Sequence, residues 1–209
     1  MAKEEDKTFY NHLVPFIGEK AALFIDVQTK GLAFHLKVTK ARETKYGDYS
    51  SPVKNKKQRI TINGNLDKYS FFLTLLHELA HLMVYENYSE QVKPHGKEWK
   101  HCFTQILLKA MNDGIFTIAI NEIINKYYIK KQSFTHNSRI KISNAIDKEL
   151  GLPASLRLEN IPMNKTVLLI NGMTVTKLEQ KRTRCICRNI ENHRLYYIHK
   201  FIEVENVIS

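Results

Sequence analysis

The sequence predicts an α+β protein, with helices around a short sheet in its first part and a small antiparallel β unit at its end. Apolar residues recur with helical spacing in residues 71–86 and again in residues 97–111. From residue 164 the chain becomes rich in β-branched and aromatic residues, which is typical of strands. We therefore expect a first domain over residues 1–135, a linker over residues 136–163 and a basic, β-rich unit over residues 164–209.

The residue pattern of the N-terminal part predicts a helix followed by strands. Residues 9–31 have helical character in two pieces, and Gly18 separates them because glycine interrupts helices. Residues 32–41 and 58–66 alternate apolar and polar side chains, as half-buried strands do. Between them we expect a short strand around residues 46–49. The order helix, strand, strand, strand then leads into the apolar helix.

The apolar helix over residues 71–86 carries the main functional signal. Asp67 or Ser70 is suited to cap its N-terminus, because short polar side chains accept hydrogen bonds from the first free backbone N–H groups. Its apolar residues lie almost all round the helix, which predicts a buried element. A further helix is expected over residues 118–130, and the polar stretch that follows is assigned to the linker.

Composition places the chain among globular proteins with an affinity for polyanions. The chain has 209 residues and a formal net charge of +11, an excess that favours nucleic acid as a partner. No apolar stretch is long enough to cross a membrane, and the charged N-terminus lacks the apolar core of a secretory signal. Three cysteines are too few for a disulfide framework. We expect a cytoplasmic protein without a membrane partner.

The segment HELAH, residues 77–81, predicts a zinc site with its own general base. Residues four apart share one face of a helix, so His77 and His81 can offer two nitrogens to one ion. Glu78 lies beside that ion without binding it, where it can accept a proton from an attacking water. The alternative is a buried helix that contains two histidines by chance and binds no metal. Leu75, Leu76 and the other apolar flanks argue against it, since buried imidazoles and carboxylates need partners.

A catalytic zinc ion needs a third protein ligand. The downstream candidates are Glu86, Glu90, His95, Glu98 and His101. His95 is favoured because Pro94 stiffens the chain before it, Gly96 permits a tight turn after it, and the following helix anchors the loop. Glu98 is the carboxylate alternative, although a negative charge is also favoured in the first turn of a helix.

These motifs resemble the SprT-like metalloprotease family, which includes the eukaryotic Spartan proteases. The resemblance is carried by HELAH and the later PHGKEW, with support from ITINGNL and TKYGDYS, and it covers roughly residues 10–112. It implies that His77, His81 and His95 bind zinc and that Glu78 is the catalytic base. It also implies a minimal zincin fold whose edge strand can pair with an extended substrate, and protein substrates associated with DNA.

The C-terminal unit departs from the family pattern. Many family members end in a zinc ribbon with paired C-x-x-C knuckles, whereas this chain offers Cys185 and Cys187, followed by His193 and His199. Residues two apart share a strand face, so a four-ligand site stays open. The C-x-C spacing nevertheless favours a zinc-free, hydrophobically packed remnant of a ribbon, and we expect one catalytic zinc ion in the chain.

Cations beside aromatic residues indicate nucleic-acid contact by this C-terminal unit. Arg182, Arg184 and Arg188 are expected on the strand face opposite the cysteines. Stacking aromatic rings and cations suit DNA, and without a base-reading motif the binding is expected to be electrostatic rather than sequence-specific.

The sequence thus favours a zinc-dependent endopeptidase acting on DNA-associated proteins. One alternative is a zinc-containing nucleic-acid-binding or transcription-associated protein without proteolytic activity. Another is a hydrolase of non-peptide amide bonds.

Overall fold

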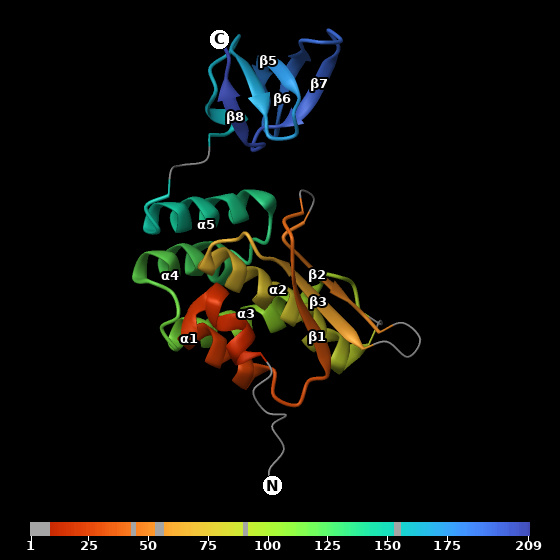
Figure 1. Cartoon of the computed structure of the whole chain (residues 1–209), viewed down its shortest axis with the longest axis vertical. Coiled ribbons are helices and arrows are strands. Elements are labelled where there is room, and N and C mark those ends of the chain that lie inside the picture. The colour runs from red at the N-terminus through yellow and green to blue at the C-terminus, as the bar shows by residue number, and fades with distance from the viewer. Residues whose placement is uncertain (1–8, 43–44, 53–56, 90–91, 153–155) are drawn as a thin grey trace. The chain divides into compact units, whose positions relative to one another are not determined.

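The computed structural model describes residues 9–42, 45–52, 57–89, 92–152 and 156–209. The chain forms two compact units, which we call the helical unit (residues 1–146) and the sheet unit (residues 147–209). Helices pack with a small sheet in the first, and antiparallel strands make up most of the second (Figure 1). The predicted α+β class is confirmed, while the predicted domain limits at residues 135 and 164 stay a prediction.

The helical unit contains most of the helices and one three-stranded sheet. Its helices are α1 (Tyr10–Gln28), α2 (Lys68–Tyr88), α3 (Lys97–Asn112), α4 (Ile118–Ile124), a π-helical segment (Asn125–Lys130) and α5 (His136–Glu149), which ends just past the unit. Its strands are β1 (Phe34–Thr39), β2 (Gly47–Ser50) and β3 (Gln58–Asn63). These elements reproduce the predicted order of helix, three strands and helices.

Two local predictions about helix ends and breaks are confirmed. Gly18 has φ 78° and ψ 166°, which divides α1 into two helical pieces. Of the two cap candidates, Asp67 is the cap: its side chain accepts from the backbone N–H groups of Tyr69 at 2.9 Å and Ser70 at 3.0 Å. Both features follow from backbone chemistry, since glycine tolerates positive φ and aspartate satisfies free N–H groups.

The three-stranded sheet gives α2 its buried surroundings. Its strand order is β1-β3-β2, with β1 parallel and β2 antiparallel to β3, so β2 lies at an edge. Helix α2 packs on β2 and β3 as well as on α1 and α3 (Figure 1). This packing accounts for the apolar residues on nearly every side of α2, of which the buried ones include Phe71, Phe72, Leu75, Leu76, Leu79, Ala80 and Leu82.

The helix over 97–111 is confirmed, and part of the expected linker turns out to be helical. The buried residues of α3 form the predicted stripe, namely Trp99, Phe103, Ile106, Leu107 and Ala110. Residues 136–149 of the expected linker, however, form α5. Ser138, Ile142 and Ile146 are all buried and recur every four residues, which is helical spacing hidden among charged neighbours.

The sheet unit confirms the predicted antiparallel β unit. It consists of a short 3-10 turn (Leu158–Asn160) and the strands β4 (Thr166–Leu169), β5 (Thr174–Gln180), β6 (Arg184–Asn189), β7 (Leu195–His199) and β8 (Val204–Val207). They form one sheet of order β7-β6-β5-β4-β8, in which each neighbouring pair is antiparallel.

The core of the sheet unit is apolar. It contains Leu158, Ile161, Val167, Leu169, Val175, Cys185, Cys187 and Val204. The buried side chain of Lys177 also lies here, and its ammonium group donates to the backbone carbonyls of Leu158, Glu159 and Ile161 and to the Gln180 side chain. Across both units, none of the helices formed by the described residues has the length and apolar character that a bilayer crossing requires.

Candidate metal centre

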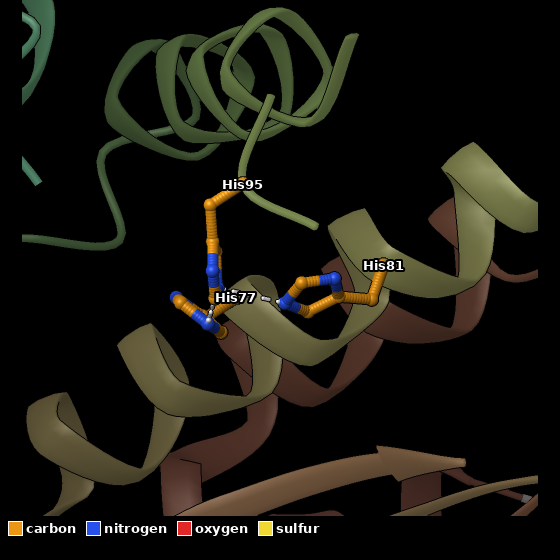
Figure 2. Close-up of side chains that lie close together, drawn as sticks. All are labelled: His77, His81 and His95. Atoms are coloured by element: carbon orange, nitrogen blue, oxygen red, sulfur yellow. Dashed lines mark hydrogen bonds between the residues drawn. The ribbon is translucent and has the colours of Figure 1, made fainter. Parts of the chain in front are cut away.

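Three histidine side chains from two separate segments converge at one point. His77 and His81 extend from successive turns of α2, and His95 reaches toward them from the loop before α3 (Figure 2). The Nε2 atom of His95 lies 3.0 Å from Nε2 of His77 and 3.0 Å from Nε2 of His81. The sequence predicted this set as ligands, and the structure brings all three together as one group that could hold a metal ion.

A tight turn aims His95 at the helix. The N–H of Gly96 donates to the carbonyl of Lys93 at 2.9 Å, which closes a four-residue turn with Pro94 second and His95 third. His95 has φ 56°, and proline followed by positive φ is typical of a type II turn. A side chain at Gly96 would place a Cβ 2.9 Å from the Lys93 carbonyl oxygen, so glycine is needed there.

The Trp99 ring packs against the rings of all three histidines. Its ring centroid lies 4.6 Å from that of His77, 5.3 Å from that of His81 and 4.6 Å from that of His95. The indole N–H also donates to the backbone carbonyl of His77 at 3.4 Å. Because Trp99 is 1% exposed and belongs to α3, it fixes this helix against the imidazoles and limits their rotation.

The histidines are in the protonation state that a metal requires. Burial, followed by the proximity of His81 and His95, lowers the pKa of His77 to about 2. Burial and His95 lower the pKa of His81 to about 4, and burial also lowers the pKa of His95. Neutral imidazoles offer a free lone pair at neutral pH.

The spacing of the cluster fits a zinc ion. Three nitrogens at ~2.0–2.1 Å from a tetrahedral ion lie roughly 3.3 Å apart. The two short separations in the cluster are within about 0.3 Å of that value. Three imidazoles with one side open to solvent, at the exposed His95, are a donor set that zinc accepts in sites retaining a position for water.

Glu78 is buried next to the cluster and has an altered acidity. Its side chain is 7% exposed. Burial and then the charge of Asp48 raise the pKa of Glu78 to about 7, against opposing contributions from the Tyr49 backbone N–H, Arg139 and Lys45. A carboxyl group with a pKa near neutrality can both accept and return a proton at the pH of a cell.

Strand β2 lies against Glu78 with no space between them. A Cβ added at Gly47 would stand 2.6 Å from Cγ2 of Thr74 and 2.8 Å from Oε1 of Glu78. Only glycine at this position lets the strand approach α2 so closely. Two residues along, the Tyr49 ring stacks on the His81 ring, with centroids 6.2 Å apart and planes 9° apart.

The other candidates for the third ligand lie elsewhere. Glu86 accepts a hydrogen bond from Gln58, and Glu98 is paired with Lys97 in the first turn of α3. His101 is exposed on α3, and Glu90 lies outside the described residues. None of these joins the group of three ligand atoms within 4.8 Å, which in the described part of the chain consists of the histidines alone.

The second set of potential ligands is dispersed. Cys185 and Cys187 share one face of β6 and are buried in the apolar core of the sheet unit. His193 and His199 are exposed, the latter at the end of β7. The two cysteines and the two histidines therefore do not gather around one point. Arg184 and Arg188 lie on the opposite, exposed face of β6, as predicted, whereas Arg182, expected on the same face, lies in a bend before the strand.

Sequence reasoning did not identify several residues around the cluster. Gly47, Tyr49 and Gln58 come from strands that contact α2 only after folding, and Arg139 comes from α5, which was assigned to the linker. The charge of Arg139 affects His77, Glu78 and His95, which places it near the cluster. The one sequence feature that could have pointed to Gly47 and Tyr49 was the Tyr-Gly-Asp-Tyr segment, residues 46–49, within an otherwise weak strand pattern.

Comparison with known proteins finds similarity over the segment that contains the cluster. The sequence model of the SprT-like family matches residues 21–119, just under half of the chain. A segment of 31 residues is 58% identical to Protein SprT of Glaesserella parasuis serovar 5 (strain SH0165) and covers 15% of this chain and 19% of that protein. The chain thus spans less than a fifth of that relative, and no solved structure was found to match it. The matched residues 21–119 include every histidine of the cluster and Glu78, so the similarity to the SprT-like family extends over the whole candidate centre.

Proposed function

We propose that the protein is a zinc-dependent endopeptidase of the SprT-like type. The observation that carries this proposal is the convergence of His77, His81 and His95, with Nε2 separations of 3.0 Å, beside the buried carboxyl group of Glu78. In this assignment the three histidines hold zinc. Glu78, which follows the first ligand in sequence and is not part of the ligand group, is the general base.

The residues of the centre divide the chemistry between them. When bound, zinc supplies Lewis-acid polarisation of a carbonyl group and lowers the pKa of a water molecule to about 7. Glu78 accepts a proton from the attacking water on a carboxylate oxygen and returns it to the nitrogen of the leaving amine. Its pKa of about 7 suits both steps. Arg139 adds a positive charge near the site of developing negative charge.

The edge strand β2 supports an extended protein substrate. Apart from the Tyr49 N–H, which donates to Glu78, its outer edge has no strand partner among the described residues, and it lies along α2 beside the cluster. A peptide that adds to such an edge presents its carbonyl groups at regular intervals to whatever lies next to the strand. A polypeptide therefore suits this site better than a small amide does.

We further propose DNA as a partner, bound through one face of the sheet unit. Register pairs Arg188 with Leu195 and Ile186 with Tyr197, which places cations and an exposed ring on the face opposite the cysteines. Tyr197 is 62% exposed. Exposed tyrosines stack on bases while arginines pair with phosphates, and both contacts are independent of sequence.

The test measures cleavage of a DNA-binding protein by the full chain and by Glu78→Gln. Each is assayed without DNA, with single-stranded DNA and with duplex DNA, and zinc content is determined for every preparation. Glu98→Gln is the matched control, because it removes the same charge from a neighbouring glutamate outside the histidine group. We expect cleavage by wild type and Glu98→Gln only, and more of it with DNA.

Two results would change this assignment. Full proteolysis by Glu78→Gln would exclude Glu78 as the base. Zinc-loaded wild-type protein that binds DNA in a salt-sensitive manner and cleaves nothing would favour the alternative, a nucleic-acid-binding protein with a structural zinc ion. The basic face of the sheet unit is the observation that keeps that alternative in view.

A further inference from the structure

Tyr49 contacts two different members of the histidine and glutamate centre. Its backbone N–H donates a hydrogen bond to the Glu78 carboxylate. Its ring stacks on the His81 imidazole, with the two planes 9° apart. The general base and a metal ligand are thus both in contact with one residue of β2, although that residue is remote from α2 in sequence.

The backbone contact depends on the place of β2 in the sheet. Because β2 is the edge strand, one of its edges has no strand partner within the described residues, which leaves a backbone N–H available for the helix. The missing side chain at Gly47 lets the strand come close enough for the bond to form. The donor therefore stabilises the charged form of Glu78 at a fixed position, as hydrogen bonds to a carboxylate do.

The side chain of Tyr49 is itself held in place. Its hydroxyl donates to Oε1 of Gln58 at 2.6 Å, and Nε2 of Gln58 donates in turn to the Glu86 carboxylate. Gln58 is 6% exposed, and Glu86 lies on α2 two turns after Glu78. The chain of hydrogen bonds runs from β2 through β3 back to the helix that carries the ligands, so the ring cannot rotate away from His81 without breaking it.

We propose that Tyr49 is a positioning residue that aligns the His81 imidazole and the Glu78 carboxylate with respect to each other. The assignment rests on the proposed function, in which those two groups are a metal ligand and the general base. Residues that orient metal ligands from behind commonly change metal affinity by ~10–100-fold when they are lost. Tyr49 differs from an ordinary supporting residue because it acts on the ligand and on the base together.

The experiment compares Tyr49→Leu, Tyr49→Phe and a matched control, Tyr46→Leu. Tyr46 lies just before the same strand, but its side chain is 58% exposed and makes no ring contact with the centre. Zinc affinity is measured by competition with a chelator, and the visible spectrum of the cobalt-substituted protein reports the geometry of the ligands. Steady-state kinetics then separate kcat from KM.

We expect Tyr49→Leu to weaken zinc binding by ~10–100-fold, to alter the cobalt spectrum and to lower kcat with little change in KM. A loss confined to kcat indicates an interaction that matters in the transition state. Both variants keep the backbone donor; Tyr49→Phe also keeps the ring and loses only the hydroxyl, so it should lie between Tyr49→Leu and wild type. Tyr46→Leu should match wild type in all three measurements.

Folding is checked by circular dichroism. If Tyr49→Leu does not fold, Gln58→Leu provides the test, since it removes the acceptor of the tyrosine hydroxyl and should shift affinity and spectrum in the same direction but less. A folded Tyr49→Leu, or failing that a folded Gln58→Leu, with wild-type affinity and spectrum would overturn the positioning role. Wild-type protein that binds no zinc or cobalt would instead overturn the proposed function.

Discussion

Two pairs of potential metal ligands in this chain share a short sequence spacing but differ in what surrounds them. His77 and His81 lie four apart on α2, and Cys185 and Cys187 lie two apart on β6, so each pair occupies one face of its element. The histidine pair meets His95 at 3.0 Å from each Nε2. The cysteine pair is instead buried within the apolar core of the sheet unit.

The two regions differ in whether another segment brings a third potential ligand to the pair. Two potential ligands on one face are common and say little about metal binding. Any two residues four apart on a helix, or two apart on a strand, share a face. What makes the histidine pair a candidate centre is a separate loop whose turn, closed between Lys93 and Gly96, brings in a further ligand. In the sheet unit the following turn and strand direct His193 and His199 to the surface instead. The candidate metal centre therefore lies in the helical unit.

Removing the third ligand should produce the largest effect. We expect His95→Ala to weaken zinc binding by more than about 100-fold, a larger loss than removal of an outer contact causes. The double variant Cys185→Ala/Cys187→Ala should bind one zinc ion with wild-type affinity. Bound zinc is measured by elemental analysis after dialysis, and affinity by chelator competition.

A second zinc ion in wild type that disappears in the double cysteine variant would contradict the contrast between the regions. Glu98→Ala serves as the control for His95→Ala, because Glu98 lies in the first turn of α3 and is not a member of the histidine group. Loss of zinc from Glu98→Ala would show that the carboxylate takes the place assigned to His95.

The next prediction uses one glycine from each unit. Gly47→Ala places a methyl group 2.8 Å from Oε1 of Glu78, so we expect proteolysis to fall by at least about tenfold while the protein stays folded. Gly172→Ala meets no atom within 4 Å but has φ 79°, so it should lower stability by about 1 kcal/mol and leave proteolysis unchanged. Activity and urea unfolding are measured for both. Equal activity of the two variants would show that close approach of β2 to Glu78 is unimportant.

The sequence was sufficient for those features that local chemistry determines. The i, i+4 histidines, the Asp67 cap and the Gly18 break each depend on neighbours within one helix or turn, and each was predictable. Tyr49 was not, since its contacts with His81 and Glu78 exist only after β2 has paired with β3 and packed on α2. The helix α5 was missed for a different reason: its buried face is narrow and its other positions are polar or charged, so the segment looks like a linker.

The basic face of the sheet unit should account for DNA affinity. In Arg184→Ala/Arg188→Ala the dependence of log affinity on log salt for single-stranded DNA should become shallower by about 1.4, because each lost phosphate contact removes about 0.7. Lys148→Ala/Lys165→Ala removes the same charge from exposed positions of the same unit outside that face and should leave the slope close to wild type. Fluorescence anisotropy over a salt series measures both. An equal change of slope in the two double variants would indicate a diffuse charge effect instead of a binding face.

The smallest predicted effects are on stability, and they have opposite pH dependence in the two regions. In zinc-free protein the pKa of His77 is lowered from 6.5 to about 2 and that of His81 to about 4. The contribution of these neutral side chains to stability is therefore fully present above pH 6.5. That stability is lost as pH falls below 6.5. In the sheet unit, burial and then Cys185 raise the pKa of Cys187 from 9.0 to about 12, so its thiol form favours folding below pH 9. That stability is lost as pH rises from 9 toward 12.

The single tryptophan lets the two pH responses be separated. Trp99 lies in the helical unit under the histidines, so its fluorescence reports unfolding there, whereas alkylation of Cys185 and Cys187 reports opening of the sheet unit. We expect the tryptophan transition in urea to move to lower denaturant between pH 6.5 and pH 4, and cysteine labelling to accelerate above pH 9. Saturating zinc should oppose the acid effect, since a ligand that binds the folded state stabilises it, and should leave cysteine labelling unchanged. Zinc that slowed labelling of the cysteines would instead place an ion in the sheet unit and remove the contrast between the two pairs.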